Sequence, residues 1–216
     1  MNFSISNIKE ESKNSLKGKY FKYFLMVLGL LAISLIPELF RPDKSSLIFE
    51  LITLIISVFV TIYCYLANLN IANGKDDFIP DMMNTLNLVM KGFTIVILTT
   101  IVSLIGLIFF IIPGIILSFM FSQAIYILIE DNSKSAIDCM IESKNMMKGN
   151  ILNLICLNLS YFPEVILCII TFGIYAFWAI PRMDVSLAYF YIHVRDSYYN
   201  RTDTFNTNDV FDINNI

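Results

Sequence analysis

The chain contains 216 residues, of which 56% are hydrophobic and only 15% are charged, with a formal net charge of −3 and a mean hydropathy of +0.68. Soluble domains usually contain about 25% charged and about 45–50% apolar residues, so this composition excludes an ordinary soluble domain. The apolar runs are rich in Leu, Ile and Phe and lack the alternation of a barrel strand. We therefore expect an all-α, polytopic membrane protein.

The apolar runs are long enough to cross a bilayer. A spanning helix needs about 20 mostly apolar residues, because the hydrocarbon core is about 30 Å thick and each residue adds 1.5 Å. Taken in pairs, the runs predict six transmembrane helices in three hairpins, each preceded by an amphipathic or polar helix on the cytoplasmic side. The predicted spans are residues 20–37, 47–70, 93–112, 114–130, 150–171 and 174–193.

Residues 1–196 are predicted to form a single integral membrane domain. The segment 197–216 is rich in Asn, Asp and Thr without apolar periodicity, which predicts a disordered cytoplasmic tail. The three hairpins divide the membrane domain into units 1–74, 75–130 and 131–196.

The distribution of positive charge predicts the orientation. With the N-terminus inside, the inner segments hold twelve of the fifteen Lys and Arg residues, and the outer loops hold only Arg41 and Lys44. Short loops rich in these residues stay on the cytoplasmic side of the membrane. We therefore expect both termini in the cytoplasm, with the protein in the bacterial plasma membrane.

The first polar segment ends in an octapeptide that nearly recurs 131 residues later. Residues 11–18 (ESKNSLKG) match residues 142–149 (ESKNMMKG), residues 90–92 form a weaker third copy, and an apolar run follows each. A binding motif is one interpretation, but we favour an architectural junction, where Lys marks the cytoplasmic side and Gly allows a bend or a close approach. The repeat residues are Ser12, Lys17, Gly18, Lys91, Gly92, Ser143, Lys148 and Gly149.

The second unit begins with an apolar stripe between residues 79 and 90 at helical spacing, which predicts an amphipathic helix at the inner surface. Pro113 and Gly114 predict a tight outer turn. Gly114, Ser118 and Ser122 then recur every four residues, a pattern typical of close helix packing. Gln123 beside this seam has two interpretations, a packing contact or a substrate contact, of which we favour packing.

The last two predicted spans carry Glu164, Arg182 and Asp184, and charges at such depth are costly unless paired or hydrated. Counting 1.5 Å per residue places Glu164 about 21–23 Å and Arg182 about 17 Å above the inner surface. We therefore predict a Glu164–Arg182 ion pair, with Asp184 as a second candidate partner. The pair is interpreted either as structural or as part of a polar path that also includes Gln123 and Asn158.

No pattern in the sequence indicates catalysis, a cofactor or a metal. His193 is the only histidine, and no second ligand stands at helical spacing from it. The cysteines have no paired spacing, and three of them lie in apolar spans, where a thiol behaves as a small hydrophobe. They are Cys64, Cys139, Cys156 and Cys168.

The chain contains several short motifs: Leu16-Lys17-Gly18, Ile112-Pro113-Gly114, Tyr126-Ile127-Leu128 with Asp131, Ala136-Ile137, Ser143 with Met147-Lys148-Gly149-Asn150, and Pro181 with Phe190-Tyr191. Together they resemble the bacterial membrane proteins known as domain of unknown function 975. The resemblance implies a small multi-pass membrane fold, distantly similar to the membrane domain of some glycerophosphodiesterases, and no established activity. The chain departs from the family where Pro163-Glu164 replaces Gly-Trp and where Arg182 replaces a Tyr.

Two functions fit the sequence. The first is a non-enzymatic protein of the cell envelope that protects against or handles membrane-active peptides, or is a scaffold for a membrane partner. The alternative is a small-solute or peptide transporter built from the three pseudo-repeated hairpins. The expected partners are the lipid bilayer and a membrane protein or a second copy of the chain, and no nucleic acid.

Overall fold

The computed structural model describes residues 4–39, 47–109 and 111–213, and these residues form ten α-helices and no strand. Arg41 and Lys44, on which the predicted outer loop depends, lie outside these ranges. The helices are α1 (Ile5–Ser15), α2 (Tyr20–Leu39), α3 (Leu47–Ala72), α4 (Met82–Phe109), α5 (Ile111–Phe121), α6 (Ala124–Glu130), α7 (Ala136–Met147), α8 (Ile151–Ser160), α9 (Phe162–Ile170) and α10 (Ala176–Ile213).

Four helical segments in the described part of the chain are long and apolar enough to cross a membrane. This confirms the expected class, a helical membrane protein, but the prediction of six spans was wrong. The four segments are Tyr20–Pro37, Ile48–Ala72, Leu88–Gly106 and Ile151–Ile170.

Two predicted spans fail for different reasons. In the window 114–130 the helix breaks, because α5 ends at Phe121 and α6 begins at Ala124. Eleven residues of α5 extend only about 17 Å, less than the hydrocarbon thickness. In the window 174–193 the helix is continuous from Ala176 onward, but Arg182 and Asp184 interrupt its apolar character.

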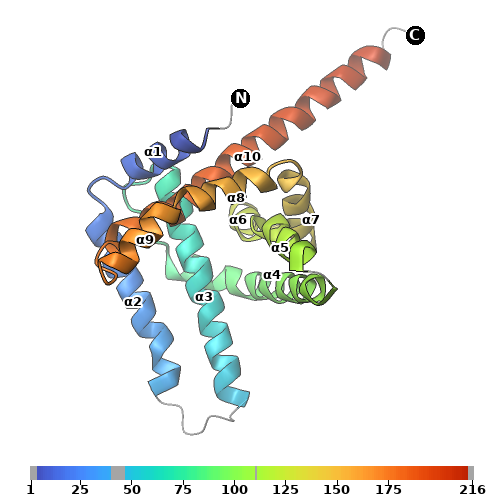
Figure 1. The fold of residues 1–216 in the computed structure, drawn as a ribbon. Coiled ribbons are helices and arrows are strands. Elements are labelled where there is room, and N and C mark those ends of the chain that lie inside the picture. Colours follow the sequence, from blue (N-terminus) through green and yellow to red (C-terminus); the bar gives the residue numbers. More distant parts are fainter. Residues whose placement is uncertain (1–3, 40–46, 110, 214–216) are drawn as a thin grey trace.

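The helices meet at a core from which pairs of helices extend (Figure 1). Helices α2 and α3 lie side by side and project from the rest of the molecule, whereas α8, α9 and α10 cross near their base. An aromatic stack marks the core: the ring centroids of Tyr65 (α3) and Tyr126 (α6) are 4.6 Å apart, and those of Tyr126 and Tyr191 (α10) are 5.0 Å apart. Helix α6 is buried along most of its length, which explains why its apolar run resembles a span.

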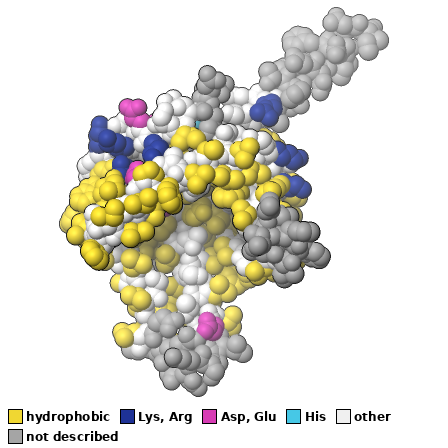
Figure 2. Space-filling model, viewed as in Figure 1, with side chains coloured by type: hydrophobic (Ala, Val, Ile, Leu, Met, Phe, Trp, Pro, Cys, Tyr) yellow, Lys and Arg dark blue, Asp and Glu magenta, His cyan; other side chains and the backbone are white. Residues whose placement is uncertain are grey.

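The apolar side chains of the four candidate spans mostly face outward. Only 11–22% of the residues in these windows are buried, and hydrophobic side chains cover much of the surface in Figure 2. A soluble protein rarely exposes such large apolar patches. This surface is therefore suited to contact with lipid.

The repeated Lys-Gly sequence ends two helices. Gly18 and Gly149 have φ values of +77° and +82°, in the left-handed region that glycine adopts most easily. Of the two roles predicted for the glycine, a bend or a close approach, the bend is absent at the third copy, because α4 continues through Gly92 without a break, and the close approach is present. A Cβ atom at Gly92 would lie 2.3 Å from the Cδ1 atom of Ile62, so this glycine instead permits close packing of α3 on α4.

Two further local predictions differ from the structure. Pro113 and Gly114 were predicted to form the outer turn but lie within the first turn of α5, where the missing proline N–H does no harm. The tail from residue 197 was predicted to be disordered, whereas α10 continues to Ile213. Tyr199 anchors the start of this extension by donating a hydrogen bond to Glu142 of α7 at 2.5 Å.

Substitution of either junction glycine by alanine should destabilise the fold. An L-residue in the left-handed region costs about 1–2 kcal/mol, so we expect Gly18→Ala and Gly149→Ala each to lower the free energy of unfolding by that amount. The measurement is thermal unfolding of the purified protein in detergent. Gly29→Ala is the matched control, because Gly29 is helical and has open space around it; equal losses in all three variants would contradict the assignment.

Candidate functional site

A cluster of charged side chains joins α1, α9 and α10. The guanidinium of Arg182 donates to the carboxylate of Glu164 at 2.7 Å, so the ion pair predicted from the sequence forms. Lys9 of α1 lies 3.5 Å from the other oxygen of the same carboxylate. The three side chains are 13–29% exposed. Two cations therefore share one anion in a partly buried site.

Local structure holds each member of this cluster in place. Pro163 stands at the start of α9, where it fits without loss of a hydrogen bond, and so places Glu164 in the first helical turn. Arg182 also donates to the hydroxyl of Tyr175 at 2.8 Å and to the carbonyl of Trp178 at 3.1 Å. A carboxylate in the first turn is additionally stabilised by the helix dipole.

Lys9 was not predicted to belong to this cluster. Its ammonium group donates to the carbonyl of Ser160 at 2.9 Å and lies 4.1 Å from the ring centroid of Tyr161. The sequence predicts α1 at the inner surface and, from the count of 1.5 Å per residue, Glu164 about 21–23 Å above that surface. The contact between Lys9 and Glu164 does not fit both predictions at once. The count treats residues 150–171 as one straight helix, whereas the α-helix is interrupted at Tyr161.

The two serines of the repeat are both fully buried and make contacts between helices. Ser12 accepts a hydrogen bond from Ser186 of α10 at 2.8 Å, and Ser186 lies 2.5 Å from the hydroxyl of Tyr161. Ser143 donates to the carbonyl of Met120, near the end of α5, at 2.8 Å. These contacts support the architectural interpretation of the repeat.

The two glutamates of the repeat both contact α10. Glu11 lies 2.9 Å from Nε2 of His193, and Glu142 accepts from Tyr199. Glu142 also accepts a hydrogen bond from Lys134 at 2.6 Å. Burial alone would lower the pKa of Lys134, but the interaction with Glu142 outweighs it and the pKa is raised. The repeat thus attaches α1 and α7 to the same long helix.

Asp184 does not pair with Arg182, contrary to the second option predicted for it. Residues two apart on a helix point in nearly opposite directions. Asp184 instead accepts a hydrogen bond from the hydroxyl of Tyr23 on α2 at 2.9 Å, and this hydroxyl also lies 3.0 Å from the side-chain oxygen of Asn68 on α3. Three helices are therefore linked through Tyr23, which the sequence did not single out.

The hydroxyl of Tyr23 has one proton for two acceptors. The second of the two contacts therefore needs a proton from the partner, which is either Asn68 or Asp184. Rotation of the Asn68 amide would present its NH₂ group to the phenol oxygen, since the O and N positions of an amide are an assignment. Protonation of Asp184 would satisfy the site in the same way.

The remaining polar candidates do not converge on the ion pair within the described part of the chain. Asn158 donates to the carbonyl of Leu154 at 2.8 Å, and Gln123 donates to Ser122 at 2.8 Å. The small-residue seam packs α5 against α4, where Ser118 donates to Ser103 at 3.1 Å. Each of these contacts is local or serves packing of neighbouring helices.

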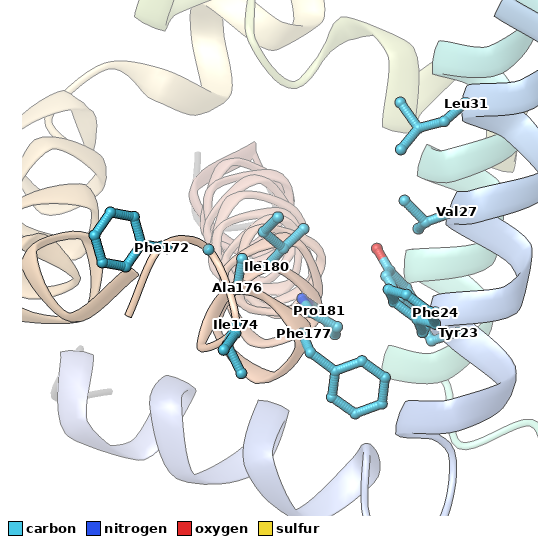
Figure 3. A pocket seen from close by; sticks show the side chains of 11 residues that line it. Tyr23, Phe24, Val27, Leu31, Phe172, Ile174, Ala176, Phe177, Ile180 and Pro181 are labelled. Carbon is cyan, nitrogen blue, oxygen red and sulfur yellow. The ribbon is translucent and has the colours of Figure 1, made fainter. Parts of the chain in front are cut away.

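An apolar groove lies beside the Tyr23 contact, on the side of α10 that faces α2. It encloses about 410 Å³ between α2 and the turn that precedes α10. Phe24, Val27 and Leu31 line it from α2, and Phe172 and Phe177 line it from the turn and from α10 (Figure 3). The rings of Phe24 and Phe177 are 4.8 Å apart at the end of the groove. The sequence could not predict this contact, because it joins segments about 150 residues apart.

Metal and thiol chemistry receive no support from the described residues. No group of three or more His, Cys, Asp or Glu side chains lies close enough to hold a metal ion there. The four cysteines are free, and Cys139 is buried. The polar contacts described above bind helices to one another.

The fold and its apolar surface define a helical membrane protein with buried polar contacts between its helices. Within that class, the chain belongs to the family described as protein of unknown function DUF975, whose model matches residues 45–197. The match confirms the resemblance inferred from the short motifs, whereas the similarity to the membrane domain of glycerophosphodiesterases stays a prediction. Comparison with curated proteins and with solved structures gives no match.

Removal of the shared carboxylate should destabilise the protein. We expect Glu164→Gln to lower the free energy of unfolding by about 2–3 kcal/mol, because Arg182 and Lys9 would remain without their anion in a partly buried site. The double variant Glu164→Gln/Arg182→Gln should lose less free energy of unfolding than Glu164→Gln alone. Unfolding in detergent measures the effect, with the exposed Glu10→Gln as control; similar losses for Glu164→Gln and Glu10→Gln would contradict this role.

Tyr23→Phe should weaken the link between α2, α3 and α10. The expected loss is about 1–3 kcal/mol, because Asp184 would lose the hydrogen bond that Tyr23 donates to it. Tyr63→Phe on α3 is the control, since no hydrogen bond is found for that hydroxyl among the described residues. Equal unfolding midpoints for the two variants would exclude a structural role for the Tyr23 hydroxyl.

Proposed function

We propose that this protein is a non-enzymatic integral membrane protein of the bacterial cell envelope, which takes up apolar parts of membrane-active peptides and so protects against them or handles them. The observation that carries the proposal is the groove between α2 and the start of α10. It is formed almost wholly by apolar and aromatic side chains. Such a groove offers binding energy to an apolar ligand that already lies in the membrane.

The size of the groove supports a peptide bound by a few side chains. A helix with side chains is about 10–12 Å wide and rises 5.4 Å per turn, so one turn fills about 400–600 Å³. The cavity of about 410 Å³ can therefore receive at most one turn. Aromatic rings at the ends of the groove are suited to hold large apolar side chains.

The chemistry of the lining supports binding without reaction. Tyr23 provides the one side chain with a hydroxyl in the lining, and that hydroxyl is engaged with Asp184. Arg182 lies on another face of α10 and binds Glu164 of α9. The lining thus has no free nucleophile or base to offer a bound peptide.

The transporter alternative is less favoured. It requires Glu164, Arg182, Gln123 and Asn158 to surround one polar cavity, and the contacts of Gln123 and Asn158 in the described structure are with their own segments. A scaffold role fits the same groove, with a membrane protein or a second copy of the chain supplying the apolar side chain. Crosslinking distinguishes this case from peptide binding.

The proposal can be tested by filling the groove. Ala176 lines the groove, so Ala176→Phe should occupy it, whereas Ala32→Phe adds the same ring at an exposed position of α2 and serves as the control. In a strain lacking the gene, we expect wild type and Ala32→Phe to restore resistance to an amphipathic membrane-active peptide and Ala176→Phe to restore it at least fourfold less. Equal expression is verified by immunoblotting.

A photoreactive residue at position 177 gives an independent readout. We expect it to crosslink the added peptide in membranes, and Ala176→Phe to abolish the product. Full resistance with Ala176→Phe, together with no peptide crosslink, would reject the proposal. A crosslink to another membrane protein or to a second copy of the chain would replace it with the scaffold function.

A further inference from the structure

Two buried polar atoms, one on α4 and one between α5 and α6, have no hydrogen-bond partner in the described part of the chain. They are Oγ1 of Thr99 and Oε1 of Gln123. Gln123 is only 2% exposed. A buried polar group without a partner is costly, so two in one region indicate a ligand that the protein itself does not provide.

The register of the two helices places these atoms together. A Cβ atom at Gly106 would lie 2.8 Å from Cα of Gly114, and Ser103 bonds Ser118 at 3.1 Å, so the helices run antiparallel in close contact. Thr99 lies one turn before Ser103 on α4, and Ser122 and Gln123 lie one turn after Ser118. Because the helices are antiparallel, both steps lead to the same level of the helix pair. Thr99 therefore lies level with the break between α5 and α6.

Thr99 differs from the other threonines with described side chains. A helical threonine commonly donates to the carbonyl four residues earlier. Six of the seven do so here, and Thr99 does not, which leaves its hydroxyl available to a partner outside its own helix. The six are Thr53, Thr61, Thr85, Thr94, Thr100 and Thr171.

The orientation of the Gln123 amide is fixed by its neighbour. The hydroxyl of Ser122 donates to the carbonyl of Phe119 at 2.8 Å, so its oxygen can only accept from Gln123. The NH₂ group of Gln123 must face Ser122, and the carbonyl oxygen must point away from it. With this arrangement of donors, the unpartnered atom is the amide oxygen, which is an acceptor.

We infer that Thr99 and Gln123 bind one buried water molecule at the break between α5 and α6. Water can donate to Oε1 of Gln123 while it accepts from the hydroxyl of Thr99, and buried waters typically make about three such bonds. A cation is disfavoured, because both side chains are neutral and removal of an ion from water would be poorly compensated. The water supplies hydrogen bonds where the helix is interrupted.

The site can be tested by thermal unfolding of the full-length protein in detergent. Thr99→Val removes the hydroxyl with little change in volume, and we expect it to lower the unfolding midpoint by about 3–8 °C, whereas Thr99→Ser should stay within about 1 °C of wild type. Thr100→Val is the matched control, since Thr100 is exposed and bonds within its own helix. We expect no change from it beyond about 1 °C.

A double variant measures the energetic coupling between the side chains of Thr99 and Gln123. If one water joins the two side chains, Thr99→Val/Gln123→Met should lose less than the sum of the single losses. A higher or unchanged midpoint for Thr99→Val would overturn the inference, because the hydroxyl would then be merely unsatisfied. A cation site would also overturn the inference. It would be identified if sodium or potassium chloride, but not choline chloride, raised the unfolding midpoint of wild type and left that of Thr99→Val unchanged.

Discussion

The constraint on which this structure depends is the lack of water inside a bilayer. A polar group that cannot reach water must be bonded by the protein, and most polar side chains between these helices follow that rule. Arg182 and Asp184 are two residues apart and point to different sides of α10, so they bind different helices. Arg182 binds Glu164 of α9, whose carboxylate also contacts Lys9 of α1, and Asp184 binds Tyr23 of α2, whose hydroxyl also contacts Asn68 of α3. Two charges on one helix thereby determine the position of four others.

Helix α10 separates the polar cluster from the groove. Trp178, Arg182 and Ser186 recur every four residues and contribute to the cluster with α1 and α9, whereas Phe177, Ile180 and Pro181 line the groove that α2 completes. One helix therefore combines a polar, charge-paired face with an apolar face that lines the groove. The contacts of the first face hold α10 against α1 and α9, and so set the position of the second face relative to α2.

Local chemistry was predictable from the sequence, whereas the paths of the helices were not. The junctions at Gly18 and Gly149 followed from the repeat, and the pair of Glu164 with Arg182 followed from the cost of unpaired charge. The count of six spans failed because an apolar run such as 124–130 can be buried in protein as well as in lipid. Lys9 and Tyr23 were missed because their partners lie 155 and 161 residues away in the sequence, and no periodicity encodes such contacts.

The shared carboxylate also connects the two ends of the chain. Glu164 contacts Lys9, which lies 155 residues earlier in the sequence, and Arg182, which lies 18 residues later. The first helix is therefore joined to the last one through a single side chain of α9, and a substitution at this one position acts on segments that are far apart in the sequence.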